Sequence, residues 1–333
     1  MSRRFQLLTI LCAVALITAI VSHGITSWLR IETAPGGYWV IGPGEGKASV
    51  FMAGSSLARD GLSWQQIASR LNHRIEGWGL AGSSPSEWER FQYLETHTSL
   101  TILVVSLYDL NEYFISDYRA QVVPLTETIE DLWETNLDWP FHKRVLSMYP
   151  LTYLRALFPT AGRSSGVIRG IREKTATYIK PLGPMEVEGT PAFSFSDFNK
   201  EKITDWSQGM MLRRLAAMRI ACQGRHVFNG PKRLALLRML NRAQHQGSVV
   251  VVVLPVSSAY SEELIASEVQ QQFEEGLAEV QHSVERVHWV RLDQLKGLSL
   301  NEYFQDLVHM NSYGQKIATE ALLDRLREFA THP

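Results

Sequence analysis

The residues of this chain that best fit a catalytic role are an aspartate and a histidine near its C-terminal end, in the stretch Asp306-Leu-Val-His309. With this spacing, both side chains can face the same side of one turn. The carboxylate can then hold the imidazole in one tautomer and stabilise its protonated form, as the general base for a serine requires. A serine suited to that base, Ser56, stands far upstream in Gly54-Ser55-Ser56.

A serine nucleophile also needs donors aimed at the oxyanion that forms when it attacks. The backbone of Ser56, the N–H of Gly79 with no side chain to block it, and the amide of Asn111 could together supply them. Simpler interpretations exist for each residue. Ser56 could cap the following helix, Asn111 could be an ordinary turn residue, and Asp306 with His309 could form a local capping pair.

The elements that must position these residues alternate between strands and helices. The expected strands are residues 49–53, 74–78, 100–107, 247–255 and 287–292. The expected helices are residues 63–71, a helix capped by Ser84, and residues 210–222, 232–244 and 313–329. This alternation predicts an α/β fold with a parallel sheet covered on both faces. In such sheets, sites gather at the carboxyl ends of the strands, where the candidate residues stand.

Four short blocks resemble those of the SGNH hydrolase superfamily, which contains GDSL-like esterases and acyltransferases. In chain order they are Gly54-Ser55-Ser56, Gly79 within residues 77–82, Asn111 within residues 109–112, and Asp306 with His309. The resemblance covers about residues 48–112 and 247–329. It implies a three-layer α/β/α sandwich with a mainly parallel five-stranded sheet. It also implies that Ser56 is the nucleophile, His309 the base and Asp306 its orienter, with an oxyanion hole of Ser56, Gly79 and Asn111.

Two residues depart from the family's pattern. Ser55 replaces the aspartate of the usual Gly-Asp-Ser, which removes one of the usual supports of the nucleophile turn. We take Ser56 rather than Ser55 as the nucleophile, because Gly-Ser-Ser also occurs in membrane-anchored relatives. Asp109 stands where a glycine is usual, and a carboxylate at that place could oppose an oxyanion.

The alternation breaks down between residues 113 and 246, which we interpret as a large helical insertion. It contains an aromatic cluster, Trp133, Trp139, Phe141, Tyr149, Tyr153 and Phe158. These aromatics could fill a small core of their own beside the sheet, or the insertion could form a lid or docking surface over the site. The expected organisation is an anchor at 1–30, a Gly- and Pro-rich tether at 31–47, and an SGNH-like domain at 48–330.

The N-terminal segment has the pattern of a membrane anchor. Arg3 and Arg4 precede an apolar run from Phe5 to about Val21, which is long enough to cross a bilayer. The basic pair predicts a cytoplasmic N-terminus with the rest exported. We therefore expect a single-pass protein of the bacterial inner membrane with a periplasmic catalytic domain. A cleaved signal peptide is the alternative, although no persuasive cleavage site follows Val21.

Composition excludes several other functions. Lys plus Arg is 33 and Asp plus Glu is 34, so no bulk charge favours nucleic acid as a partner. The histidines show no metal-ligand spacing and no dinucleotide fingerprint occurs, so we expect neither a metal nor another cofactor.

The expected function is that of an exported serine esterase or O-acyltransferase. Its substrate would be an acylated sugar or cell-envelope polysaccharide, and an integral membrane acyltransferase is a possible partner. The alternatives are a degenerate, non-catalytic protein that binds polysaccharide or assists assembly, and a lipid- or peptidoglycan-acting hydrolase with the insertion as its lid.

Overall fold

In a computed structural model, the chain is described at residues 3–29, 38–42, 49–80, 82–89, 98–114, 158, 208–222 and 224–331. The predicted aromatic cluster, apart from Phe158, and most of the predicted insertion lie outside these residues. The chain divides into two compact units. Helix α1 and Phe158 belong to the first unit, and the sheet with its covering helices belongs to the second.

The apolar N-terminal run forms the helix α1 (Arg3–Leu29). Within the part of the chain that the structure describes, no helix has the length and apolar character needed to cross a membrane. The membrane anchor therefore stays a prediction.

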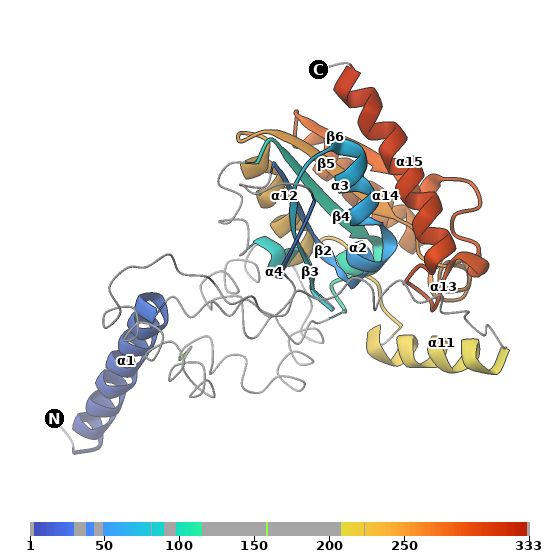
Figure 1. Cartoon of the computed structure of the whole chain (residues 1–333). Coiled ribbons are helices and arrows are strands. Elements are labelled where there is room, and N and C mark those ends of the chain that lie inside the picture. The colour runs from blue at the N-terminus through green and yellow to red at the C-terminus, as the bar shows by residue number, and fades with distance from the viewer. Residues whose placement is uncertain are drawn as a thin grey trace. The chain divides into compact units, whose positions relative to one another are not determined.

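The second unit is built on a six-stranded sheet with the strand order β1-β3-β2-β4-β5-β6 (Figure 1). The five predicted strands are present as β2 (Val50–Ser55), β3 (Ile75–Leu80), β4 (Leu100–Ser106), β5 (Ser248–Leu254) and β6 (Val287–Arg291). Neighbouring strands among these five run parallel. The α/β class and the mainly parallel sheet are thus confirmed, but the predicted strand count of five is wrong.

The sixth strand, β1 (Tyr38–Ile41), pairs antiparallel with the edge of β3. It lies inside the segment that we expected to be a tether. Four residues between Gly- and Pro-rich stretches are too few to show a strand period. Contact with β3 decides the pairing: a Cβ on Gly77 would lie 2.6 Å from a ring carbon of Trp39, so the Trp39 ring occupies the space above that glycine.

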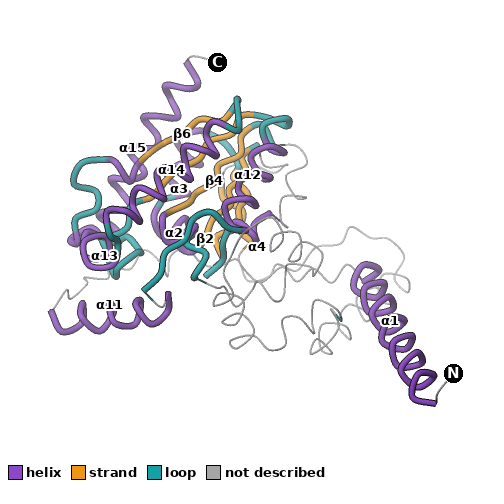
Figure 2. Tube along the Cα trace, turned by 180° about the vertical axis from the view of Figure 1, so that it is seen from behind, coloured by secondary structure: helices purple, strands orange, loops and turns teal. Residues whose placement is uncertain are grey.

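Helices cover both faces of the sheet (Figure 1, Figure 2). On one face, α15 (Ser312–Thr331) packs against α2 (Ser56–Gly61) and α3 (Trp64–Leu71). On the other face, α12 (Pro231–Ala243) packs against α4 (Pro85–Trp88) and α14 (Ser267–His282). Helix α12 is the crossover between β4 and β5. Helix α12 lies within the segment that we interpreted as an insertion, and it packs as part of the sandwich.

The remaining described helices are short or stand at the sheet's carboxyl edge. They are α5 (Leu107–Leu110), α11 (Gln208–Cys222), α13 (Ser258–Leu264), and the 3-10 turns η3 (Leu292–Gln294) and η4 (Asn301–Tyr303). The prediction of helices at 210–222 and 232–244 is confirmed by α11 and α12. Helices α13 and α14 were not predicted.

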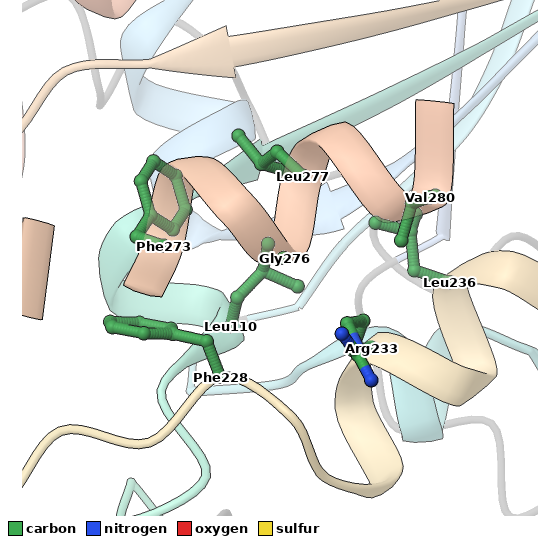
Figure 3. Close-up of a pocket in the computed structure, with 8 residues that line it drawn as sticks. All are labelled: Leu110, Phe228, Arg233, Leu236, Phe273, Gly276, Leu277 and Val280. Carbon is green, nitrogen blue, oxygen red and sulfur yellow. The ribbon is translucent and has the colours of Figure 1, made fainter. Parts of the chain in front are cut away.

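The core lies between the sheet and its helices. The side chains of β5 from Val249 to Val253 are at most 1% exposed, as expected of a strand covered on both faces. A small apolar hollow between α12 and α14 is lined by Leu110, Phe228, Arg233, Leu236, Phe273, Gly276, Leu277 and Val280 (Figure 3). None of the predicted site residues lines it, so we assign it to the packing of these two helices.

Candidate active site

The structure brings Ser56, His309 and Asp306 together. Ser56 Oγ lies 2.8 Å from His309 Nε2, and His309 Nδ1 lies 2.9 Å from Asp306 Oδ2. Because Nδ1 faces a carboxylate, the Nδ1–H group donates to Asp306. Nε2 is then unprotonated and can accept the hydroxyl proton of Ser56. This is the order of contacts that activates a serine for attack.

The two serines of the nucleophile turn have different tasks. Ser55 is the N-cap of α2, and its hydroxyl accepts a hydrogen bond of 3.1 Å from the Leu57 backbone N–H. Ser56 begins the helix and directs its hydroxyl to His309 instead. The capping interpretation therefore applies to Ser55, and the structure leaves Ser56 available for chemistry.

The turn is compact because Gly54 allows a close approach. A Cβ at Gly54 would lie 2.2 Å from the Ala58 Cβ and 3.1 Å from the Val104 backbone oxygen. A side chain at this position would push α2 away from β2. Glycine at residue 54 thus brings the first turn of α2, and Ser56 with it, against the end of the strand.

Asp306 and His309 lie in a tight loop between η4 and α15. Asp306 Oδ1 accepts hydrogen bonds from the backbone N–H groups of Val308, at 2.9 Å, and His309, at 2.7 Å. The local capping interpretation therefore holds, but it does not replace the catalytic one. The backbone bonds fix the carboxylate within the loop while it also contacts the imidazole.

Two residues that the sequence analysis missed hold this loop from outside. The Ser257 hydroxyl, just beyond β5, donates to the Leu307 backbone oxygen at 2.8 Å. Arg214 of α11 donates to the Gln305 backbone oxygen at 2.7 Å. Neither contact has a sequence signal, because both join a side chain to a backbone atom far away along the chain.

The charges of Asp306 and His309 favour the ion-paired form of these two residues. Burial alone lowers the His309 pKa, but the hydrogen bond and the negative charge of Asp306, with the charge of Asp60, outweigh burial and raise it above its ordinary value. Burial alone raises the Asp306 pKa, but the hydrogen bond and charge of His309 and the backbone donors lower it overall. A base whose protonated form is stabilised in this way accepts the serine proton more readily.

Gly79 lies inside β3, level with Gly54 rather than with Ser56. A Cβ there would lie 2.8 Å from the Cβ of Arg59 on α2, so helix packing by itself accounts for this glycine. Gly82 follows the end of β3 with a φ of +69° and open space around the position of a Cβ. Ser55 pairs with Leu80 at the end of β3. Gly82, which follows that end, is therefore placed nearer than Gly79 to the edge of the sheet where Ser56 lies.

Asn111 is fully buried, and its side chain is engaged with backbone groups. Its amide donates to the Arg225 oxygen at 3.4 Å, and its oxygen accepts from Tyr113 N at 3.2 Å and Val227 N at 3.1 Å. The structure thus places Asn111 after β4, as predicted, but uses its side chain to hold residues 225–227. Its oxyanion role stays a prediction.

A buried lysine holds the same loop. Lys232 Nζ donates to the backbone oxygens of Asn111, at 2.7 Å, and Phe114, at 2.6 Å. The Lys232 backbone N–H donates to Glu112 Oε1 at 2.8 Å. The start of α12 therefore fastens the loop that follows β4.

Within the described part of the chain, no group of three His, Cys, Asp or Glu side chains could hold a metal ion. The chemistry that the arrangement can perform is proton transfer and nucleophilic attack by its own side chains. Neither the protein-family models nor the curated proteins compared with this chain match it.

Proposed function

We propose that this protein is a serine acyl-ester enzyme of the SGNH type, an esterase or O-acyltransferase. The observation that carries the proposal is the continuous contact from Ser56 Oγ to His309 Nε2 and from His309 Nδ1 to Asp306. Three side chains from two distant segments meet in the order that serine catalysis requires. The resemblance of the four sequence blocks to the superfamily supports the same function.

In the proposed reaction, Ser56 Oγ attacks the carbonyl carbon of an acyl ester while His309 Nε2 takes the hydroxyl proton. The tetrahedral intermediate collapses, the alcohol leaves with the proton that His309 returns, and an ester forms at Ser56. Water or a sugar hydroxyl then attacks this ester, giving up its proton to His309. The bond between Ser56 Oγ and the acyl carbon breaks, and His309 returns the proton to Ser56 Oγ. Asp306 stays ionised and stabilises the imidazolium in both halves.

The oxyanion of each intermediate needs donors. In our proposal the backbone N–H of Ser56 is one of them, with a glycine after or within β3 as the second. Gly79 is the glycine of the sequence prediction, and Gly82 is the one that the strand register favours. Asn111 contributes only if its amide leaves the Arg225 oxygen when substrate binds.

A fluorophosphonate that reacts with activated serines tests the proposal. The full-length chain is expected to be labelled at Ser56, and Ser56→Ala is expected to abolish labelling and the hydrolysis of short acyl esters. Ser55→Ala is the matched comparison: it removes the neighbouring hydroxyl but keeps the contact between Ser56 and His309, so it should leave the chain labelled. A folded protein with neither label nor esterase activity would favour the alternative of a non-catalytic, polysaccharide-binding protein.

The proposed substrate is an acylated sugar or polysaccharide of the cell envelope, and the proposed location is the periplasmic face of the inner membrane. Arg3 and Arg4 before the apolar run support this location, as do the exposed apolar side chains of α1, such as Leu16 and Ile17. An anchored enzyme could receive acyl groups from an integral membrane acyltransferase. Hydrolysis and transfer share the acyl-Ser56 intermediate and differ only in the acceptor.

Two measurements test these finer points. Carbonate extraction of membranes is expected to leave the full-length chain in the pellet and to release a chain that lacks residues 1–30. The acyl-enzyme, formed from an activated acetyl ester, is expected to pass its acetyl group to added oligosaccharide faster than to water. Release of acetate at the same rate with and without oligosaccharide would support an esterase instead.

A further inference from the structure

The buried carboxyl group of Asp109 lies next to the nucleophile turn and takes no part in the mechanism above. Asp109 belongs to α5, directly after β4, and is 3% exposed. Strand β4 pairs with β2, with Gly54 opposite Val104. The residues that continue these two strands, Ser55 and Ser56 on one side and Ser106 and Asp109 on the other, therefore meet at the same edge of the sheet.

The contacts of this carboxyl group are incomplete. Ser106 Oγ donates to Asp109 Oδ2 at 2.9 Å and accepts from the Asp109 backbone N–H at 3.2 Å. Oδ1 is buried, and no hydrogen bond of ordinary geometry reaches it. A buried carboxylate oxygen without a donor costs folding free energy, and native proteins keep few such groups.

The charged and polar groups around Asp109 come from β2, β4, α12 and the loop before α15. The net result of its surroundings is to raise the Asp109 pKa to about 6. Burial is the main cause, and it outweighs the Ser55 and Ser106 hydroxyls and the charges of Lys232 and His309, which act to lower the pKa. The Ser55 hydroxyl is thus close enough to act on the carboxyl group, although it does not complete a hydrogen bond to Oδ1. The charge of Asp109 therefore acts on the Ser55–Ser56 turn and on His309.

We propose that Asp109 is a positioning residue that holds the Ser55–Ser56 turn in place against His309 through the hydroxyl groups of Ser55 and Ser106. This inference rests on the proposed function, because it assigns the carboxyl group a role in the reactivity of Ser56. In the proposal, the Ser55 side chain shifts so that its hydroxyl donates to Oδ1. The nucleophile turn would then be fastened to β4 as well as to α2.

The second-order rate constant for labelling by a small fluorophosphonate tests the proposal in the full-length chain. Asp109→Asn keeps the shape of the side chain but replaces one carboxylate oxygen by an amide donor. We expect labelling to slow by about ten-fold, which is well short of the loss expected when the general base itself is removed. Ser55→Ala is expected to slow it by a smaller factor.

The double variant separates positioning from independent effects. If Asp109 acts through Ser55, the variant with both substitutions is labelled about as fast as Asp109→Asn alone, because the second change removes nothing further. If the two residues act independently, the fold-losses of the two single variants multiply in the double variant. A multiplied loss, or labelling of Asp109→Asn within about two-fold of wild type, would overturn the proposal.

Stability measurements distinguish this role from a structural one. Because the Asp109 pKa is raised, its ionised form opposes folding as the pH rises through about 6. Asp109→Asn is therefore expected to leave the urea midpoint at pH 8 unchanged or higher while labelling slows. Asp293→Asn is the matched control: it also removes a carboxyl group whose pKa burial raises, but one that pairs with Arg291 instead of facing the nucleophile turn. We expect its urea midpoint at pH 8 to be likewise unchanged or higher, with an unchanged labelling rate of the folded protein.

Two further outcomes are informative. If Asp109→Asn does not fold, Ser106→Ala keeps the carboxyl group but removes its donor to Oδ2 and the acceptor of the Asp109 backbone N–H. It is expected to slow labelling in the same direction, and unchanged labelling in Ser106→Ala would overturn the proposal. If the wild-type chain is not labelled, the proposed function fails and the role of Asp109 fails with it. Labelled wild type with normal labelling of Asp109→Asn contradicts only the present inference.

Discussion

Two loops at the carboxyl edge of the sheet are expected to form the site, and they are built differently. The loop of Asp306 and His309 directs the His309 ring at Ser56 and the Asp306 carboxylate at that ring, while its backbone is held by Ser257 and Arg214. The loop of Asn111 directs its side chain at backbone groups of residues 113, 225 and 227. The first loop presents an imidazole to a serine hydroxyl, whereas the second binds its own backbone surroundings.

The proposed base is already oriented toward Ser56, whereas the proposed oxyanion donor is bound to another group. Catalytic groups act best when they are already oriented, because no reorganisation is then needed during the reaction. His309 meets this condition, but Asn111 has to exchange an existing hydrogen bond for a new one. Disruption of the first loop should therefore reduce activity, and disruption of the second should mainly reduce stability.

The largest effect is expected from His309→Ala. Without a base, Ser56 keeps its proton, and ester hydrolysis is expected to fall by about 10⁴-fold or more, as for other catalytic dyads and triads. Stopped assays with a short acyl ester measure the loss. Added imidazole should restore part of the activity if the side chain acts as a base, and no restoration would indicate that the substitution disturbs the loop instead.

Asp306→Asn is expected to have the next largest effect, with a loss of about 10²–10⁴-fold. Wild-type activity should rise with pH as His309 loses its proton, with a midpoint above the ordinary histidine value because the pKa is raised. The asparagine variant loses the charge that raises this pKa, so its midpoint should move down. Equal midpoints in the two pH profiles of kcat/KM would contradict the role of Asp306.

For the second loop, Lys232→Met is expected to change stability more than chemistry. The substitution leaves the Asn111 and Phe114 oxygens without their buried donor, which should lower the free energy of unfolding by about 2–4 kcal/mol. Urea denaturation measures this change. Arg233→Met is the control, because its ion pair with Glu279 is partly exposed and should contribute about 1 kcal/mol or less.

The smallest effects are expected from substitution of Gly79 or Gly82, the two candidate sources of the second oxyanion donor. Gly79→Ala forces a Cβ against Arg59 and should cost about 1–3 kcal/mol of stability. Gly82→Ala meets no atom, but its φ of +69° should cost about 1 kcal/mol. If Gly82 supplies the oxyanion donor, the labelling rate of the folded protein should fall more in Gly82→Ala, and the reverse order would assign the donor to Gly79.

Much of the fold could be predicted from the sequence. The strands β4 and β5 are continuous apolar runs, and the Ser84-Pro85-Ser86-Glu87 pattern forms the capping box that starts α4. The spacing of Asp306 and His309 is local, so it indicated the loop directly. By contrast, β1 is recognisable only from its pairing with β3. The sequence analysis counted α12 as part of the insertion, because the sequence between β4 and α12 gives no local signal that this helix packs on the sheet.

What the sequence determined by itself is therefore the set of local features: the buried strands, the Gly54-Ser55-Ser56 turn and the Asp306/His309 pair. Short-range sterics and hydrogen bonds specify these features, and they show in the order of residues. Only the tertiary structure decided that Ser55 caps α2 while Ser56 faces His309, that the Asn111 amide is engaged, and that Asp109 lies beside the turn. These outcomes depend on contacts between segments far apart in the chain, which strand pairing and helix packing bring together.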